Sequence, residues 1–161
     1  MRLLRIVSLI ALAIAALPDI TTAQEAAAQN PSVNTTLDIT LPAGIACAFS
    51  VVISGQGKAK AIELPGNRSI FTSPGLNVTV TNLDDPSKQV GSLKITGASH
   101  VTTSSDGSVA WVATGRNLML DPLAGFVLAI GHYSYAFDFA GNLIQPFTGK
   151  GQLIDICAMI E

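Results

Sequence analysis

The sequence predicts an all-β protein: a single antiparallel β-barrel or β-sandwich of about eight to ten short strands, preceded by an N-terminal signal peptide. Turn-forming residues recur about every ten residues from Pro42 onward, which leaves room for strands but not for ordinary helices. Segments between the turns alternate apolar and polar side chains, as half-buried strands do. Because short antiparallel strands must cover their edges, we expect a closed barrel or a packed sandwich, and both alternatives stay open.

The N-terminus has the organisation of a secretory signal peptide. Arg2 and Arg5 precede an uncharged apolar run over residues 6–17, and small residues follow up to Ala23. The apolar run is shorter than the roughly 20 residues that span a bilayer as a helix. A cleaved signal is therefore favoured over an uncleaved anchor.

Cleavage is expected after Ala23, with Ala28 as the second choice, so the mature protein is expected to be secreted outside the cell. The residues that follow are polar and without a period, which is typical of a flexible arm. The predicted organisation is a signal peptide at 1–23, a flexible leader at 24–36 and an antiparallel β domain at 37–161.

Charge argues against several classes of partner. Of the 9 basic and 11 acidic side chains in the chain, signal removal takes away Arg2, Arg5 and Asp19, which leaves a net charge of −3. No basic stripe is present that would neutralise phosphates, so nucleic acid is not expected as a partner. Later apolar runs are interrupted every few residues by Gly, Ser, Thr or Lys, so no membrane span is expected after signal cleavage.

The strand period is clearest in the middle of the domain. In Asn77–Asn82 the valines fall on one face and the polar side chains on the other. Asp106-Gly107 separates two further alternating runs, and this dipeptide favours a hairpin turn because both positions tolerate positive φ. Asp84-Asp85 is expected to cap the backbone of another turn.

Other local expectations follow from the same rules. At most one short helix is expected, around Arg116–Pro122. The glycines of Gly55-Gln-Gly57, Gly131 and Gly149-Lys-Gly151 are interpreted as chain reversals. Further strands are expected at Ala46–Ser54, Ser92–Thr96, Gly125–Ile130, His132–Ala140 and Gln152–Ile160.

Two cysteines, Cys47 and Cys157, remain after signal removal. An exported protein meets an oxidising compartment, where such a pair is expected to form a disulfide. The bridge would close a loop of about 110 residues and stabilise the fold by roughly 4–5 kcal/mol through loop entropy. Two separately buried thiols are the alternative, and neither cysteine has the His or Cys neighbours of a metal site.

Aromatic side chains alternate along His132–Ala140. One side of this strand is expected to carry Tyr133, Tyr135, Phe137 and Phe139. Such a row most often forms the thickest part of a core, because aromatic side chains bury large areas. Alternatively, it lines a cavity for an apolar ligand or forms a platform for sugar rings. The candidate ligand-lining residues are Trp111, Tyr133, Tyr135, Phe137 and Phe139.

No motif for catalysis, metal or cofactor binding stands out. The chain has only two histidines, His100 and His132, and contains no H-x-H, H-E-x-x-H, C-x-x-C or G-x-S-x-G. No metal or cofactor is therefore expected, no catalytic residue is assigned, and a non-enzyme is favoured without being settled. Four acidic residues on predicted strands would matter only if the fold brought them together: Asp38, Glu63, Asp138 and Asp155.

Three N-glycosylation sequons occur, at Asn34-Thr-Thr36, Asn67-Arg-Ser69 and Asn77-Val-Thr79. Chance predicts about one such triplet in a chain of this composition, so the excess favours a secreted glycoprotein. The candidate sites are Asn34, Asn67 and Asn77. The alternative is a source organism that does not glycosylate, in which case the triplets carry no modification.

Three functions fit these features. The favoured one is a non-catalytic binding or interaction protein with a cell-surface partner or a small apolar ligand, because charge and histidine are scarce. The second is a carrier that holds a small apolar molecule inside a β-barrel lined by the aromatic residues. The third is a barrel-type isomerase or cyclase with a sparse polar site.

Overall fold

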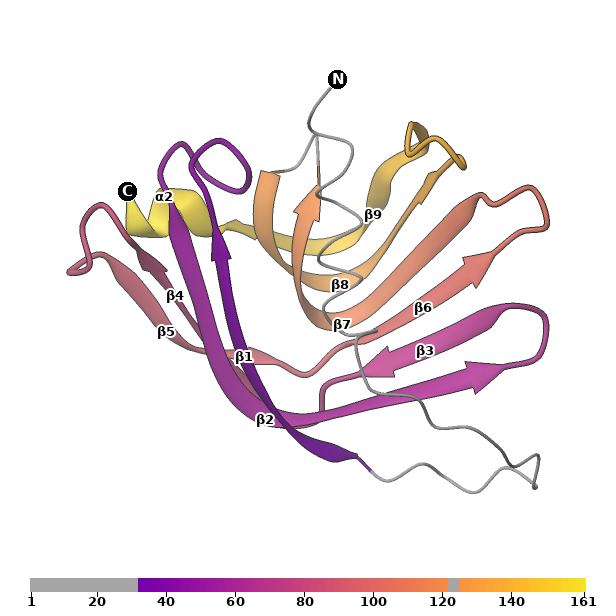
Figure 1. Cartoon of the computed structure of the whole chain (residues 1–161), viewed down its shortest axis with the longest axis horizontal. Coiled ribbons are helices and arrows are strands. Elements are labelled where there is room, and N and C mark those ends of the chain that lie inside the picture. The colour runs from indigo at the N-terminus through magenta and orange to yellow at the C-terminus, as the bar shows by residue number, and fades with distance from the viewer. Residues whose placement is uncertain (1–31, 122–124) are drawn as a thin grey trace.

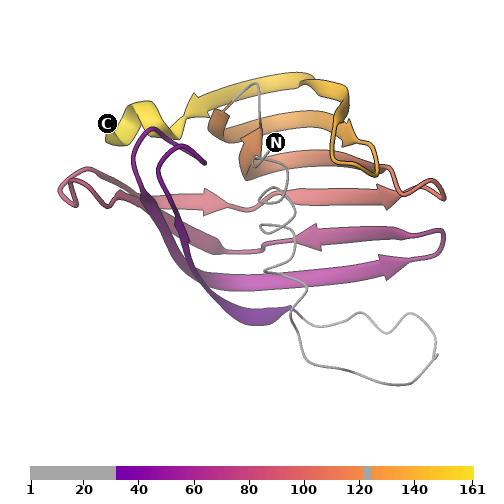
Figure 2. The ribbon, with the colours of Figure 1, turned by 45° about the horizontal axis from the view of Figure 1, so that its top comes forward.

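A computed structural model of the chain describes residues 32–121 and 125–161, and most of these residues lie in antiparallel strands (Figures 1 and 2). One short helix, α2 (Ile156–Ile160), follows the last strand. The strands in the described residues are β1 Val33–Leu41, β2 Val51–Leu64, β3 Arg68–Thr72, β4 Leu76–Asn82, β5 Gln89–Ile95, β6 Ala98–Thr103, β7 Val109–Asp121, β8 Gly125–Phe137 and β9 Leu143–Asp155.

The all-β class is confirmed, and the nine strands lie within the expected number. β2, β7, β8 and β9 have 13 or 14 residues, so they are longer than expected. The strand order in the described residues is β5-β4-β2-β3-β6-β7-β8-β9, with β1 also paired to β2. Among the strands of residues 32–121 and 125–161, no pairing joins β9 to β5 or to β1, so the sheet is open.

Two pairs of strands, β3 with β4 and β5 with β6, lie end to end with a short break between the two members of each pair. β3 and β4 run in the same direction along one side of β2, with a break at residues 73–75. β5 and β6 pair with β4 and β3 in turn, and their break is at residues 96–97. The sheet is therefore a meander of long antiparallel strands, and both breaks fall at the same level.

Glycines occupy this level in every long strand. Gly115 of β7, Gly131 of β8 and Gly151 of β9 are direct cross-strand partners. Their φ angles are 80°, 145° and 144°, conformations that favour glycine. β7, β8 and β9 bend midway along their length (Figure 1). We call this series the glycine line; its members are Gly57, Gly75, Gly97, Gly115, Gly131 and Gly151.

Close backbone approach explains why side chains are excluded from the glycine line. A Cβ atom added to Gly131 would overlap the carbonyl oxygen of Lys150, and one added to Gly151 would overlap that of Ile130. A Cβ on Gly115 would lie 3.1 Å from the Cα of Gly97. The bend of the sheet therefore requires glycine at these positions in neighbouring strands.

The expectation that Gly55-Gln-Gly57, Gly131 and Gly149-Lys-Gly151 reverse the chain is wrong. All three lie inside continuous strands, β2, β8 and β9. Glycine serves both tight turns and close contacts between strands, and here the second role applies.

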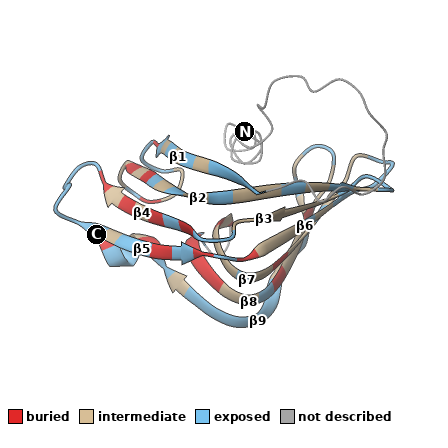
Figure 3. Ribbon diagram, turned by 90° about the horizontal axis from the view of Figure 1, so that it is seen from below, coloured by how far each residue is buried: buried red, intermediate tan, exposed pale blue. Residues whose placement is uncertain are grey.

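The main hydrophobic core lies on one side of the glycine line, where β1, β2, β4 and β5 face the first half of β8 and α2. Figure 3 shows buried residues along β4, β5 and β8. Alternation supplies the core side chains from each strand, because every second residue points inward. The largest fully buried side chains are Val51, Val78, Val80, Leu128, Ile156 and Ile160.

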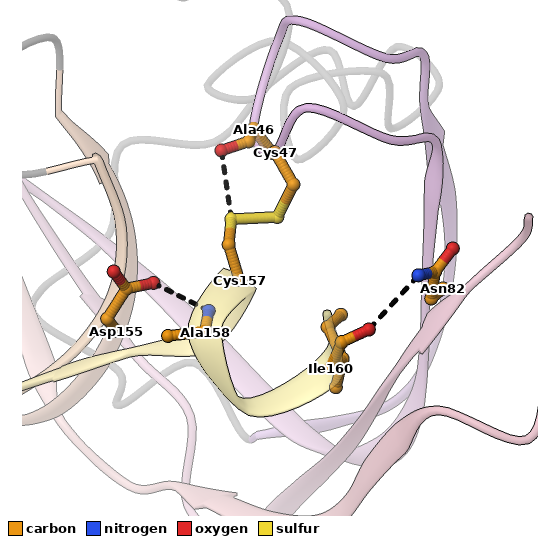
Figure 4. Close-up of a disulfide and its surroundings, with 7 residues drawn as sticks. All are labelled: Ala46, Cys47, Asn82, Asp155, Cys157, Ala158 and Ile160. Carbon is orange, nitrogen blue, oxygen red and sulfur yellow. Dashed lines mark hydrogen bonds between the residues drawn. A yellow bond between two sulfur atoms is a disulfide. The ribbon is translucent and has the colours of Figure 1, made fainter. Parts of the chain in front are cut away.

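A disulfide between Cys47 and Cys157 joins the β1–β2 loop to α2, with 5.5 Å between the Cα atoms (Figure 4). The carboxylate of Asp155 caps α2 by accepting a hydrogen bond from the N–H of Ala158 at 3.1 Å. The buried side-chain amide of Asn82 donates to the carbonyl of Ile160 at 3.0 Å. The predicted bridge is present, and hydrogen bonds hold the helix that carries it.

Several predicted boundaries are wrong. The strand expected at Ala46–Ser54 begins only at Val51, so Cys47 lies in a loop. The strand expected at Gln152–Ile160 becomes helix at Ile156, where Asp155 caps the chain. The sequence allows for at most one short helix, around Arg116–Pro122; over residues 116–121 β7 continues instead, Pro122 lies outside the described residues, and the short helix of the described chain is α2.

β1 starts at Val33, so the last four residues of the predicted leader 24–36 belong to a strand. The predicted signal peptide and both cleavage positions lie outside the described residues. Within residues 32–121 and 125–161, no helix has the length and apolar character needed to cross a bilayer.

Replacing Gly131 by alanine tests the glycine line. We expect Gly131→Ala to lower the free energy of unfolding by about 3 kcal/mol or more, because the side chain meets backbone and φ is positive. The control is Gly91→Ala in β5, where a Cβ would meet only the Thr79 side chain, at 3.5 Å. Urea denaturation of both variants measures the difference, and equal losses would contradict the proposed role of the glycine line.

Removing the disulfide should lower the free energy of unfolding by about 4–5 kcal/mol, because the bridge spans 110 residues. The variant is Cys47→Ser combined with Cys157→Ser, compared with the oxidised protein by urea denaturation. The unsubstituted chain in reducing agent should lose a similar amount. An unfolding midpoint that does not respond to reduction would show that the bridge is not formed.

Candidate functional site

Aromatic rings gather on one face of the sheet beyond the glycine line. Direct cross-strand partners in antiparallel strands share a face, and Trp111 of β7 faces Tyr135 of β8. Their rings stack, with centroids 5.9 Å apart and planes 7° apart. Tyr133 stacks on Phe147 of β9 with ring centroids 5.0 Å apart, and Tyr135 and Phe137 form a T-shaped pair with centroids 5.5 Å apart. We call the face that carries these five rings the aromatic face.

The aromatic face lies on the inside of the bend. Tyr133, Tyr135 and Phe147 pack with Met119, Val127 and Ala129, which come from the other side of the glycine line. Strands whose two halves touch through the same face must be bent toward that face. We call this hydrophobic cluster the second core; it lies on the inside of the bend at the glycine line.

The five candidate ligand-lining residues have different environments. Tyr133 is 5% exposed and belongs to the second core. Trp111, Tyr135 and Phe137 are half-buried on the same face. Phe139 lies apart in the β8–β9 turn, 84% exposed, with its ring over Gly107 of the neighbouring turn. The structure thus brings together four of the five, and the expectation that Phe139 shares their strand face is wrong because β8 ends at Phe137.

Phe147 belongs to the aromatic face but was missed from the sequence. The sequence predicts a reversal at Gly149-Lys-Gly151 and therefore no strand for the residues before it. A strand that continued through those glycines would have placed Phe147 beside β8, on the same face as Tyr133.

Tyr135 is the titratable group most affected by this environment. Burial raises the pKa of the Tyr135 phenol well above its usual range, and the negative charge of Asp121 raises it further. Asp121 is 3% exposed and lies at the end of β7, on the other side of the glycine line. Tyr135 is therefore a neutral phenol at physiological pH, within electrostatic range of a buried carboxylate.

Basic and acidic side chains are separated between the two faces beyond the glycine line. Lys60, His132 and Lys150 belong to one cross-strand row, which runs through Thr72, Ala98 and Thr114. The neighbouring rows of that face hold His100 and Arg68. The row on the aromatic face instead runs through Glu63, Ser69, Val101, Trp111 and Tyr135.

The four acidic residues noted in the sequence are not brought together. Asp38 is exposed on β1, and Asp155 caps α2. Asp138 lies in the β8–β9 turn, where its carboxylate accepts hydrogen bonds from Asn142 that lower the Asp138 pKa. Glu63 lies on the aromatic face. In the part of the chain that the structure describes, no three His, Cys, Asp or Glu side chains are grouped as metal ligands.

Asp85 and the three sequon asparagines lie at the surface. Asp85 accepts hydrogen bonds from the backbone and hydroxyl of Ser87, which lower the Asp85 pKa, so the expected turn cap is confirmed at this position. Asn34 lies on β1, Asn67 in the β2–β3 turn and Asn77 on β4, and all three side chains are exposed.

No protein-family model, curated protein or solved structure matched this chain when it was compared with them. The aromatic face offers stacked rings, a neutral phenol and carboxylates. Both histidines are exposed on the opposite face. This arrangement suits the binding of a small molecule with apolar surface.

The pH dependence of stability tests the environment of Tyr135. The folded state keeps the phenol proton after the unfolded chain loses it, so the free energy of unfolding should fall as pH rises above about 10. Tyr135→Phe should lose less stability between about pH 9 and pH 11 than the unsubstituted protein. Urea denaturation at several pH values measures this, and identical pH profiles would contradict it.

Proposed function

We propose that this protein is a secreted, non-catalytic binding protein that holds a small molecule with apolar surface on its aromatic face. The signal-like sequence of residues 1–23 and the Cys47–Cys157 bridge support an extracellular site of action. The three exposed sequon asparagines suit a glycoprotein.

The observation that carries this proposal is the stacked ring series across β7, β8 and β9. Trp111, Tyr135, Phe137 and Phe147 are half-buried, so each keeps part of its surface for a ligand. Aromatic rings in contact give large apolar area on rigid side chains, which lowers the entropy lost on binding. These rings lie beside the second core on the inside of the bend, so a ligand there would extend an apolar surface that is already in place.

Two alternatives receive less support. A carrier with its ligand enclosed in a barrel requires a closed sheet, whereas in the described residues β1, β5 and β9 each keep one unpaired edge. An isomerase or cyclase requires an acid and a base on one side of a pocket. His100 and His132 lie on the face opposite the rings, away from Glu63 on the aromatic face.

The proposal is tested with an apolar fluorescent dye, N-phenyl-1-naphthylamine, added to the purified protein. We expect saturable binding that Trp111→Leu and Phe147→Leu each weaken by about tenfold, because each removes an aromatic contact of about 1 kcal/mol and ring area. Phe139→Leu is the control, since Phe139 lies outside the aromatic face, and it should leave dye affinity unchanged.

Circular dichroism confirms that each variant is folded before its affinity is compared. Dye affinity that stays the same in Trp111→Leu and Phe147→Leu would place the binding elsewhere and overturn the proposal. Absence of saturable dye binding to the unsubstituted protein would overturn it as well.

A further inference from the structure

We propose that the ligand of the aromatic face is a small organic cation, bound between the indole ring of Trp111 and the carboxylate of Glu63. The inference rests on the proposed function, because it names the ligand chemistry for the same face. The class it identifies is an ammonium group with apolar substituents, such as a quaternary ammonium ion.

Trp111 supplies one side of this site. Its indole stacks on Tyr135 in the direction of β8. The opposite indole face is therefore turned toward β6, where the cross-strand partner is Val101, and Ser69 follows on β3. Both side chains are smaller than an aromatic ring, and Trp111 is half-buried, so part of its ring surface is accessible. Indole faces attract cations more strongly than other aromatic rings do.

Glu63 supplies the other side. It belongs to the same cross-strand row as Trp111 and lies three strands away, about 14 Å at the usual strand spacing. Its Oε2 accepts a hydrogen bond of 2.6 Å from the Ser69 hydroxyl, which draws the carboxylate toward Trp111. A cation within about 6 Å of the ring centroid would lie above Val101 and face this carboxylate.

The distribution of charge selects a cation over an anion or a neutral molecule. Lys60, His132 and Lys150 lie on the opposite face of the same strands. On the aromatic face, Glu63 lies at one side, and the charge of Asp121 reaches Tyr135 at the other. A neutral ligand would gain the ring contacts alone, whereas a cation would also gain the attraction of these carboxylates.

The test compares choline with 3,3-dimethylbutan-1-ol, which has the same shape but carbon in place of the charged nitrogen. Trp111 is the single tryptophan of the chain, so its fluorescence reports binding at this position. We expect choline to bind at least tenfold more tightly than the neutral alcohol. Glu63→Gln should weaken choline binding several-fold and leave binding of the alcohol unchanged, because only the cation interacts with the carboxylate.

Asp38→Asn is the matched control for Glu63→Gln, since it removes one exposed carboxylate from β1 and should not change choline affinity. Calorimetry measures choline binding to Trp111→Leu, which we expect to lose it. Equal affinity for choline and the alcohol, with dye binding retained, would overturn the cation site and leave the proposed function standing. Loss of dye, alcohol and choline binding together in the unsubstituted protein would overturn both.

Discussion

The close approach of backbone to backbone along the glycine line is the constraint on which the rest of the structure depends. Where Gly115, Gly131 and Gly151 meet, the strands leave no room for side chains, and the sheet bends. On one side of this line, the first half of β8 packs against β4 and β5 to form the main core. On the inside of the bend, the two halves of β7 and β8 meet around the aromatic rings. Both hydrophobic clusters thus depend on the bend that the glycine line allows.

The all-β class followed from alternation and turn spacing, which are local and survive in the folded chain. Val78 and Val80 are buried as their alternation predicts, and the cysteine pair is bridged, as expected for a chain whose sequence predicts export. The role of each glycine, by contrast, could not be predicted from the residues next to it in the sequence. Whether glycine reverses a chain or permits another strand to approach depends on the partner strand, which is not known until the fold is known.

The candidate site was predicted only in part for the same reason. Tyr133, Tyr135 and Phe137 share a strand, so their common face was visible in the sequence. Trp111 and Phe147 reach that face through the register of β7 and β9, and Glu63 reaches it through three further pairings. Separation of charge between the two faces is likewise a property of register, because Lys60 and Lys150 lie far apart in the chain but in one row.

In the described residues β1, β5 and β9 each pair with another strand on one side only, and the two outermost by chain order, β1 and β9, differ in their protection against aggregation. β9 contains Pro146 and Lys150, which discourage the addition of another strand. β1 contains neither proline nor lysine, and its outer face carries Asn34 of the first sequon. A glycan at this asparagine would shield the edge by bulk, whereas protein made in a host without glycosylation presents a bare template for intermolecular strand addition.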